Sequence, residues 1–432
     1  MKEICMNTFE NVLIIGSGVA GMEASLMLSK AGKKVYLVEK LSLIGGKTIK
    51  NEETFPNMDC STCLVAPIQQ EILQDQKIDV MTVSTVQKVS GKAGNFKVTI
   101  NKKARYVNIA ACLGCGMCYP VCPVEQSNEW EENLINKKAI YVPCSGSLPN
   151  VPVIDADKCL RLNGSEECNL CVEACMFGAI DFTEKNETIE IEVGGIIVAT
   201  GFDMLDVSEI ENLGYKKYPG VYTAMEFERL FAANGPTEGK LTLRETEKIP
   251  ESIAIIHCVG RKEVGYCSSI CCMYSSKHAQ FLKHKLPEAK IYNLYSDICV
   301  SDKTYQKFQK NVAKHSSKFI YRDDKSELEI TQNDNKLKVS YQNNKGIQDA
   351  VTVDMVILAN ATVPSNDIEL LTDVLQIEKD KFGFIDTQSF RIGSVVTSKP
   401  GIFVAGCAEG AKDLQSSVLQ AEAAVSQILS MK

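Results

Sequence analysis

Residues 11–39 read NVLIIGSGVAGMEASLMLSKAGKKVYLVE, and this stretch decides the fold. The run NVLIIG is continuously apolar, as expected for a strand that is buried on both faces of a parallel sheet. A glycine-rich turn follows, then a stretch with helical periodicity, and then a second apolar strand that ends at Glu39. This order of strand, glycine turn, helix, strand and acid predicts a βαβ unit that binds a dinucleotide.

The turn contains Gly16, Gly18 and Gly21 in the spacing G-x-G-x-x-G. The first glycine permits the tight turn, the second lets the backbone approach a pyrophosphate, and the third lets helix and strand pack closely. The phosphates then lie at the helix N-terminus, where free N–H groups favour anions. Glu39 stands 18 residues beyond Gly21, about where an acid accepts the ribose hydroxyls. A strand, turn and helix without a ligand is the alternative interpretation.

Further apolar runs that suit buried strands are spread over the whole chain. All such runs, the first two included, lie at residues 12–15, 35–38, 196–198, 253–256, 356–359 and 402–404. A helical stretch runs from about Asp413 to Leu429. This distribution predicts an α/β protein with two nucleotide-type sheets, the first of which is built from discontinuous segments.

Composition limits the other classes of function. The chain has 432 residues, and 47 Lys and Arg against 54 Asp and Glu give a net charge of −7. A mildly acidic chain without a basic block is not expected to bind nucleic acid. The sequence contains no run of about 18 apolar residues, so no membrane span is predicted. The first residues, MKEICMNTFE, contain no apolar signal region, so the expected compartment is the cytoplasm.

The composition is unusual in its 18 cysteines. Residues 112–123 read CLGCGMCYPVCP, which is the C-x-x-C-x-x-C-x-x-x-C-P run of bacterial ferredoxins. In such a run three thiolates bind one [4Fe–4S] cube, and the fourth thiolate binds a second cube. A zinc site is the weaker interpretation, because zinc sites rarely combine four cysteines at this spacing with a trailing proline.

A second cysteine run supplies the partner set. It contains Cys159, Cys168, Cys171 and Cys175, with the loop LRLNGSEE in its first gap and Met176 in the place of the usual proline. The crossover rule assigns one cube to Cys112, Cys115, Cys118 and Cys175, and the other to Cys122, Cys159, Cys168 and Cys171. Residues 104–183 are therefore expected to form an inserted ferredoxin-like domain with two [4Fe–4S] clusters.

A third group of cysteines lies in residues 253–278, IAIIHCVGRKEVGYCSSICCMYSSKH. The strand IAIIH runs into the turn where a second dinucleotide fingerprint belongs, but only Gly260 is present there, so a nicotinamide site is not expected. Four thiols stand there instead and can bind one further cube: Cys258, Cys267, Cys271 and Cys272. The adjacent Cys271 and Cys272 are an unusual ligand pair. A dithiol–disulfide pair and plain buried cysteines are the alternatives.

Six cysteines remain outside these sets. Cys60 and Cys63 form C-x-x-C in NMDCSTCLVAP. They are expected either to share a further cluster with a partner chain or with Cys5, or to act as a redox dithiol. The others are expected to be ordinary small buried residues: Cys144, Cys299 and Cys407. The four histidines show no ligand spacing: His257, His278, His284 and His315.

Taken together, these motifs resemble those of the A subunit of heterodisulfide reductase, the flavin and iron–sulfur subunit of methanogens and many anaerobic bacteria. The resemblance rests on GSGVAGMEAS, VEK, the Gly45–Gly46 pair, DCSTC, KKARYV before the first cysteine run, VGGIIVATGFD, HCVG with YCSSICCMYSSKHA, and GCAEGAKDLQSSVLQAEAA. These segments follow one another over nearly the whole chain.

The resemblance implies a thioredoxin-reductase-like fold with FAD in the first site and a degenerate nicotinamide-type domain that carries a [4Fe–4S] cluster. The implied FAD-binding parts are residues 1–103, 184–250 and 351–432, the ferredoxin-like insertion is 104–183, and the degenerate nucleotide-binding-like domain is 251–350. The residues expected at FAD are Gly16, Gly18, Gly21, Glu39, Lys40, Gly46, Gly201, Gly406 and Cys407. Lys277 matches a lysine that the family places near the flavin N5; the alternative is a solvated surface lysine.

The resemblance also implies an oxidoreductase that acts on sulfur groups within a complex. Its flavin would bifurcate electrons between a low-potential acceptor, such as ferredoxin, and a high-potential acceptor of the disulfide type. The implied partners are subunits of the heterodisulfide reductase B and C types, a hydrogenase- or dehydrogenase-linked electron donor, and ferredoxin. The full-length methanogen form has an extra N-terminal domain and a further C-terminal ferredoxin module, whereas this chain begins close to the FAD strand and ends just after the last FAD helix. The family's route to ferredoxin would therefore require a separate subunit here.

Three other functions stay open at this point. The related A-type subunit of quinone-interacting membrane complexes has a similar short build, although DCSTC favours the heterodisulfide reductase type. A stand-alone flavin disulfide reductase would use NAD(P)H and the pair Cys60 and Cys63, but it needs the missing second fingerprint and a pair just after Gly45–Gly46. A scaffold that holds clusters for structural reasons would need no flavin site.

Overall fold

The computed structural model describes residues 10–165, 167–244, 246–300, 302–324, 326–388 and 395–431. The chain divides into two compact units. Unit 1 consists of Met1–Ile49, Thr62–Phe202 and Pro364–Lys432, and unit 2 consists of Lys50–Ser61 and Asp203–Val363. The strands β12 (Phe202–Met204) and β21 (Thr362–Pro364) pair with each other where the chain passes from one unit to the other.

Unit 1 is built on a parallel sheet with the strand order β22-β11-β1-β2-β3. The strands are β1 (Asn11–Ile15), β2 (Lys34–Val38), β3 (Ile78–Met81), β11 (Gly195–Val198) and β22 (Ile402–Val404). In the central strand, Ile14 lies beside Ile197 on one side and Leu37 on the other. The sheet therefore combines three distant parts of the sequence, as the apolar runs indicate.

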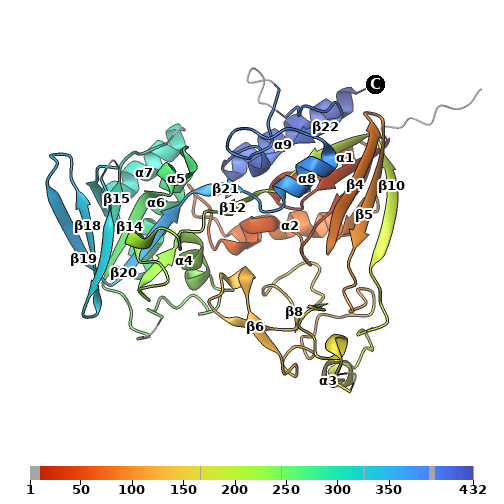
Figure 1. Ribbon diagram of the computed structural model, residues 1–432, viewed down its shortest axis with the longest axis horizontal. Helices are drawn as coiled ribbons and strands as arrows, with labels where there is room; N and C mark the ends of the chain where they lie inside the picture. Colours follow the sequence, from red (N-terminus) through yellow and green to blue (C-terminus); the bar gives the residue numbers. More distant parts are fainter. Residues whose placement is uncertain are drawn as a thin grey trace, which may run out of the picture. The chain divides into compact units, whose positions relative to one another are not determined.

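Helices pack on one face of this sheet, and a second sheet packs on the other (Figure 1). The first face carries α1 (Val19–Lys30), α2 (Ser61–Gln74) and α9 (Leu414–Ser430), with Met22, Ile72 and Val425 in the shared core. The second face carries α8 (Ile368–Leu375) and the antiparallel strands β4 (Ser84–Lys92), β5 (Asn95–Lys102) and β10 (Glu187–Val193).

Gly16 and Gly21 make the tight turn between β1 and α1 possible. The Gly16 N–H donates to the Val38 carbonyl oxygen at 2.8 Å, which ties the turn to β2. A Cβ atom on Gly21 would lie 1.9 Å from the Gly16 carbonyl oxygen, so no other residue fits there without a backbone shift. This contact brings the first turn of α1 directly against the end of β1.

Residues 104–183, which are part of unit 1, leave and re-enter its antiparallel sheet at one place, between β5 and β10. Lys102 pairs with Glu187 across the antiparallel ladder, and a bridge between Val107 and Ile180 continues the pairing into the insertion. The insertion contains β6 (Glu125–Ser127), β7 (Asn136–Lys138), β8 (Ile140–Tyr141), β9 (Val153–Ile154) and α3 (Leu170–Ala174). Its small core consists of apolar side chains and cysteines.

The Arg105 guanidinium joins the insertion to the parallel sheet of unit 1. It is buried and donates to the carbonyl oxygen of Ser42 at 2.8 Å and to the hydroxyl of Thr82 at 2.7 Å. It also donates to the carbonyl oxygen of Val151 at 2.8 Å, within the insertion. Burial lowers the pKa of Arg105 to about 10, so the side chain stays charged at neutral pH. These hydrogen bonds fix the start of the insertion against the ends of the sheet.

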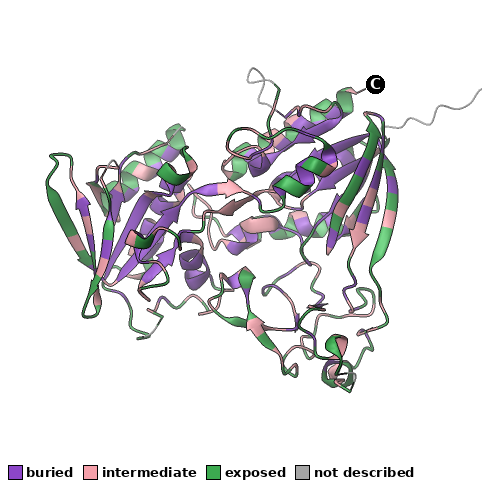
Figure 2. Ribbon diagram, in the orientation of Figure 1, coloured by how far each residue is buried: buried purple, intermediate pink, exposed green. Residues whose placement is uncertain are grey.

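Unit 2 is built on a second parallel sheet, with the order β13-β20-β14-β15-β16. The strands are β13 (Val221–Thr223), β14 (Ser252–Val259), β15 (Lys290–Tyr295), β16 (Lys318–Tyr321) and β20 (Met355–Asn360). The central strands β14 and β20 are buried along nearly their whole length (Figure 2). An antiparallel sheet packs on one face and consists of β17 (Glu329–Asn333), β18 (Lys336–Gln342) and β19 (Gln348–Val353).

The helices of unit 2 contact or follow these strands. They include α4 (Ala224–Phe231), α5 (Arg261–Val264), α6 (Cys271–Lys285) and α7 (Lys303–His315). α6 connects β14 to β15 and contacts both strands, as a crossover between parallel neighbours must. In the part of the chain that the structure describes, no helix has the length and apolar character needed to cross a lipid bilayer.

Unit 2 is longer than residues 251–350, the range expected for the degenerate nucleotide-binding-like domain. β13 and α4 lie before this range and β20 lies after it, because β20 pairs with both β13 and β14. Residues 203–250 and 351–363 were expected in the FAD-binding domain and instead lie in unit 2.

Gly21→Ala is expected to destabilise the chain although alanine is the better helix former. Helix propensity alone favours alanine by about 1 kcal/mol. The added Cβ, however, would lie 1.9 Å from the Gly16 carbonyl oxygen. Overpacking of this kind costs about 1–3 kcal/mol, so the urea midpoint should fall. Gly18→Ala is the matched control, since a Cβ there meets nothing within 4 Å. An equal loss of stability in both variants would contradict the packing role of Gly21.

Candidate flavin and iron–sulfur sites

Three glycines from distant parts of the sequence follow neighbouring strands of the unit 1 sheet. β1 pairs in parallel with β11, and β11 pairs in parallel with β22. Gly16, Gly201 and Gly406 come after these strands, so they lie at the same edge of the sheet. Ligands of open α/β sheets bind at this carboxyl edge.

Gly18 lies at the start of α1 with open space beside it. Its φ of −69° and ψ of −177° suit any residue, and a Cβ there would meet nothing within 4 Å. Neither the backbone nor a neighbour in the protein therefore requires glycine at this position. Gly201 has the same open space, and the buried hydroxyl of Thr200 has no hydrogen-bond partner. Free space and an unsatisfied hydroxyl beside a helix N-terminus fit the phosphates of a dinucleotide.

Glu39 is buried and faces the glycine turn. Its Oε2 accepts from the N–H of Ser17 at 2.9 Å and from the Ser17 hydroxyl at 2.7 Å, and its Oε1 accepts from the N–H of Leu41 at 2.8 Å. Gly46 is close to the same turn, because a Cβ there would lie 2.7 Å from the Gly18 Cα. Glu39, the acid predicted from the sequence, and Gly46, from the Gly45–Gly46 pair, thus both lie beside the glycine turn.

The remaining residues expected at FAD have different surroundings. Lys40 is half-exposed and forms an ion pair with Asp367. The Gly406 carbonyl oxygen accepts from Lys412 Nζ at 2.9 Å. Cys407 is buried, its thiol donates to the Lys412 carbonyl oxygen at 3.4 Å, and burial raises its pKa. Lys40 is therefore engaged in an ion pair at the surface. Gly406 and Cys407 lie at the sheet edge near the start of α9.

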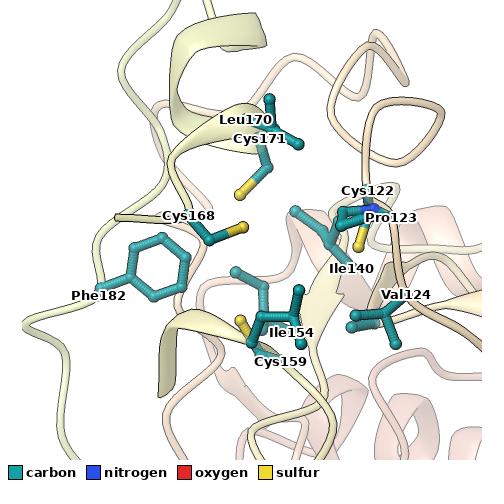
Figure 3. Close-up of a pocket in the computed structure, with 12 residues that line it drawn as sticks. Cys122, Pro123, Val124, Ile140, Ile154, Cys159, Cys168, Leu170, Cys171 and Phe182 are labelled. Atoms are coloured by element: carbon teal, nitrogen blue, oxygen red, sulfur yellow. The ribbon is translucent and has the colours of Figure 1, made fainter. Parts of the chain in front are cut away.

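Four cysteines of the insertion line one small cavity (Figure 3). They are Cys122, Cys159, Cys168 and Cys171. Figure 3 shows their sulfur atoms around the same space, which Ile140, Ile154 and Phe182 also line. One of the four comes from the first cysteine run and three come from the second. This is the set that the crossover rule assigns to one cube.

The other cysteines of the two runs also approach one another. Burial, together with the nearby thiols of Cys112, Cys175 and Cys171, raises the pKa of Cys118 to about 11. The N–H of Gly114 donates to Cys112 Sγ at 3.4 Å, and the N–H of Ala179 donates to Cys175 Sγ at 3.4 Å. Such N–H···S bonds stabilise negative charge on sulfur and are typical around cluster ligands. Cys115, the fourth member of this set, is exposed.

The third group of cysteines lies where β14 ends and α6 begins. Cys258 sits at a β-bulge between Ile256 and Val259 and has a φ of 60°, which is uncommon for a residue with a side chain. The hydrogen bond between the two buried thiols of Cys271 and Cys272 raises the pKa of the first and lowers the pKa of the second. The Cys258 and Cys267 thiols are near enough to raise the pKa of Cys271 further.

The cysteine sets can be compared with the requirements of a single metal ion and of a four-iron cube. Within the described ranges, no group of three or more His, Cys, Asp and Glu side chains is arranged to hold one metal ion. A cube does not need such convergence, because each thiolate binds iron at a different corner. Thiols spread around a cavity, as in the insertion, match that requirement.

Cys60 and Cys63 are joined by a disulfide at the start of α2. In this state neither sulfur is a free thiolate, so the pair has the form of an oxidised redox dithiol. Cys5, the other residue considered for a shared cluster, lies outside the described residues.

Lys277 is buried, and the alternative that it is a solvated surface lysine is wrong. Its Nζ donates to Glu228 Oε1 at 2.8 Å and to the Glu53 carbonyl oxygen at 2.9 Å. Burial raises the pKa of Glu228, but the charge of Lys277 and the hydrogen bond from His278 outweigh it and lower the pKa to about 2. Burial lowers the pKa of His278, whose Nε2 lies 2.6 Å from Glu228 Oε2. The group is a buried ion pair with a neutral imidazole.

Two residues of these sites were not predicted as site residues from the sequence. Glu228 lies on α4, and a glutamate in an amphipathic helix gives no signal that it will be buried. Cys299 was expected to be an ordinary buried residue, but it is half-buried and its N–H donates to Cys272 Sγ at 3.4 Å. Its position just after the strand KIYNLY is the signal that could have placed it beside the third cysteine group.

Glu228→Gln is expected to destabilise the chain strongly, because it leaves the Lys277 ammonium group buried without a counter-charge. Removing one partner of a buried ion pair costs about 3–5 kcal/mol. Urea unfolding at pH 7 measures the difference from the parent. Glu369→Gln is the matched control, because Glu369 pairs with Lys379 at the surface and an exposed pair contributes at most about 1 kcal/mol.

The effect of Glu228→Gln should depend on pH in a defined direction. The pKa of Glu228 is about 2 in the folded chain against an ordinary value of 4.5, so its stabilising contribution is complete above pH 4.5. The contribution is lost as the pH falls from 4.5 toward 2, and the gap between parent and variant should narrow over that window. A gap that stays constant there would show that folding does not lower the pKa of Glu228.

Known proteins match the chain over most of its length. Residues 11–50 match the family described as FAD binding domain. The A subunit of the H(2):CoB-CoM heterodisulfide,ferredoxin reductase of Methanothermobacter marburgensis is 37% identical over 426 residues, which are 97% of this chain and 63% of that protein. The A subunit of the ferredoxin/F(420)H(2)-dependent CoB-CoM heterodisulfide reductase of Methanosarcina acetivorans is 36% identical over 427 residues, 98% of this chain and 53% of that protein.

Solved structures show the fold. The thioredoxin reductase of Lactococcus lactis aligns with a TM-score of 0.52 and 16% identity, over 98% of this chain and all of that chain. The thioredoxin reductase of T. acidophilum aligns with a TM-score of 0.51 and 14% identity, over 98% of each chain. The expected thioredoxin-reductase-like FAD-binding α/β fold is thereby confirmed. The chain spans 63% and 53% of the two curated relatives, and over nearly its whole length it is homologous to the A subunit of heterodisulfide reductase, as its motifs predict.

Proposed function

We propose that the chain is the FAD and iron–sulfur electron-transfer subunit of a heterodisulfide reductase-type complex, an oxidoreductase that acts on sulfur groups. The observation that carries the proposal is the cavity lined by Cys122, Cys159, Cys168 and Cys171. One thiol from the first run joins three from the second, which is the interlocked pattern of two-cluster ferredoxins. The names of the curated relatives support the same class of complex.

The proposal assigns three [4Fe–4S] clusters to this chain. Two belong to the insertion, which we propose to be a ferredoxin-like domain. Their ligands are Cys122, Cys159, Cys168 and Cys171 for one cube, and Cys112, Cys115, Cys118 and Cys175 for the other. The third cube belongs to Cys258, Cys267, Cys271 and Cys272, at the turn of unit 2 where a second dinucleotide fingerprint is missing. Each cube carries one electron at a time, so three cubes form a path toward other subunits.

The proposal places FAD at the glycine turn of unit 1. When bound, FAD supplies the exchange between electron pairs and single electrons. The N-terminus of α1 and the open space at Gly18 accept the phosphates, and the unsatisfied Thr200 hydroxyl can donate to them. The Glu39 carboxylate is held in place by Ser17 and Leu41 and retains acceptor capacity for the ribose hydroxyls.

The proposed role of Lys277 near the flavin ring must take account of its buried partner. The Lys277 ammonium group lies 2.8 Å from the Glu228 carboxylate. The field that Lys277 exerts on any neighbour is therefore that of an ion pair and not that of a lone cation. Glu228 thus becomes part of the environment that sets the effect of Lys277.

The proposal extends to electron bifurcation between ferredoxin and a disulfide-type acceptor, in the cytoplasm, with subunits of the heterodisulfide reductase B and C types. The electron donor would be a hydrogenase- or dehydrogenase-linked subunit. The names of the relatives mention H(2), F(420)H(2) and ferredoxin, so the donor or acceptor differs among them.

The anaerobically purified chain should contain about one FAD and about twelve irons, from three four-iron cubes.

Gly18→Val should lose the FAD while it keeps the irons, because the valine side chain fills the open space beside the α1 N-terminus. Flavin absorbance and iron analysis measure both contents. Normal flavin in folded Gly18→Val would show that this turn is not the FAD site, and about eight irons in the parent would remove the third cluster.

A second candidate function is a stand-alone flavin disulfide reductase, which the Cys60–Cys63 disulfide favours. Such an enzyme would take electrons from NAD(P)H. The turn after β14 opposes this, because it holds Gly260 and the third cysteine group in place of a second glycine fingerprint.

The isolated chain should therefore not oxidise NADH or NADPH at a useful rate. Anaerobic reduction of the flavin by either nicotinamide, followed at the flavin absorbance band, tests this. The double variant Cys60→Ser with Cys63→Ser is the control, because it removes the dithiol and leaves the turn after β14 intact. Fast reduction of a disulfide substrate by the parent but not by the double variant would establish the second candidate.

A further inference from the structure

Unit 2 gathers more thiols at the third cysteine group than a four-iron cube can bind. The sequence assigns four cysteines to this cube, and the structure adds Cys299 to them. Cys299 packs against the buried pair Cys271 and Cys272. A fifth thiol among four ligands requires an explanation, because a cube takes one thiolate for each of its four irons.

The sheet topology places Cys299 in a position equivalent to that of Cys258. β14 and β15 are parallel neighbours, so the residues that follow them meet at the same edge of the sheet. Cys258 lies at the end of β14, and Cys299 lies four residues after β15 ends at Tyr295. An ion pair of 2.6 Å between Arg261 and Asp297 joins the two following loops.

The contacts of Cys299 lead to two of the proposed ligands. Its N–H donates to Cys272 Sγ at 3.4 Å. The Cys267 thiol is near enough to raise the pKa of the Cys299 thiol. Cys299 therefore lies against the start of α6, where Cys271 and Cys272 are. The Cys258 thiol, at the end of β14, is also near Cys271.

The backbone conformation at Cys258 is energetically less favourable for a residue with a side chain than the common conformations are. Cys258 has a φ of 60° and sits at an irregularity in the β14–β20 pairing. Together with Cys267 it lines an open pocket, so solvent reaches this side of the group. A sulfur–iron bond made by Cys258 can thus exchange with a proton from solvent.

We propose that Cys299 is a reserve ligand of the third cluster and binds the iron that Cys258 binds whenever Cys258 is absent or dissociated. The proposal rests on the proposed third cluster. In the exchange, the Cys299 thiol gives its proton to solvent as its sulfur–iron bond forms, and Cys258 takes up a proton as its bond breaks. Iron content, charge and electron count of the cube stay the same, so no oxidant or reductant is needed.

The experiment compares the iron content and the EPR spectrum of the reduced, anaerobically purified full chain in four proteins. They are the parent, Cys258→Gly, Cys299→Ser, and the double variant. Glycine is chosen at position 258 because it adopts a φ of 60° without strain. Serine at position 299 keeps the N–H that donates to Cys272. Circular dichroism and FAD content show that each variant is folded.

The parent, Cys258→Gly and Cys299→Ser should each contain about twelve irons, and the double variant about eight. Cys258→Gly should also change the EPR signal of one cluster, because one ligand sits on a different loop. The control Cys258→Gly with Cys144→Ser should keep about twelve irons, since Cys144 lies in unit 1.

Loss of the third cluster in Cys258→Gly alone would overturn the reserve role. Loss in Cys299→Ser alone would also overturn it, since Cys299 would then be an obligatory ligand. About twelve irons in the double variant would overturn it as well. About eight irons in the parent is a different result: it would refute the third cluster of the proposed function itself.

Discussion

Parallel strand pairing is the constraint on which the rest of this structure depends. Strands that run side by side in one direction bring the residues after them to a single edge of the sheet. In unit 1 this edge collects Gly16, Gly201 and Gly406 from β1, β11 and β22. In unit 2 the same rule brings the loops after β14 and β15 together. Both the glycine turn after β1 and the third cysteine group are consequences of this one arrangement.

The insertion obeys a different constraint. β5 and β10 are antiparallel, and Lys102 pairs with Glu187, so the chain can leave and return without breaking the ladder. A segment as small as the insertion can bury little apolar surface, and its core includes cysteine side chains. Metal clusters are one of the means by which small domains compensate for a small core. We infer that the cubes would stabilise the insertion as well as carry electrons.

Buried charge at Arg105 and at Lys277 is compensated by nearby oxygen atoms. Arg105 donates to carbonyl and hydroxyl oxygens on the sheet and on the insertion, and Lys277 pairs with Glu228. Burying such groups without partners would carry a large desolvation penalty. These contacts therefore specify where the insertion starts and how α4 and α6 pack within unit 2, and they depend on side chains far apart in the sequence.

The sequence by itself determined the α/β class, the glycine turn, the acid after β2 and the grouping of the cysteines into runs. These features are local, since each depends on the spacing of a few neighbouring residues. The crossover set Cys122, Cys159, Cys168 and Cys171 also followed from spacing, and the structure places these side chains around one cavity. Only the tertiary structure decided the extent of unit 2, the burial of Lys277 against Glu228, and the position of Cys299. Each of these depends on which distant strands and helices pack together, and no local pattern encodes that choice.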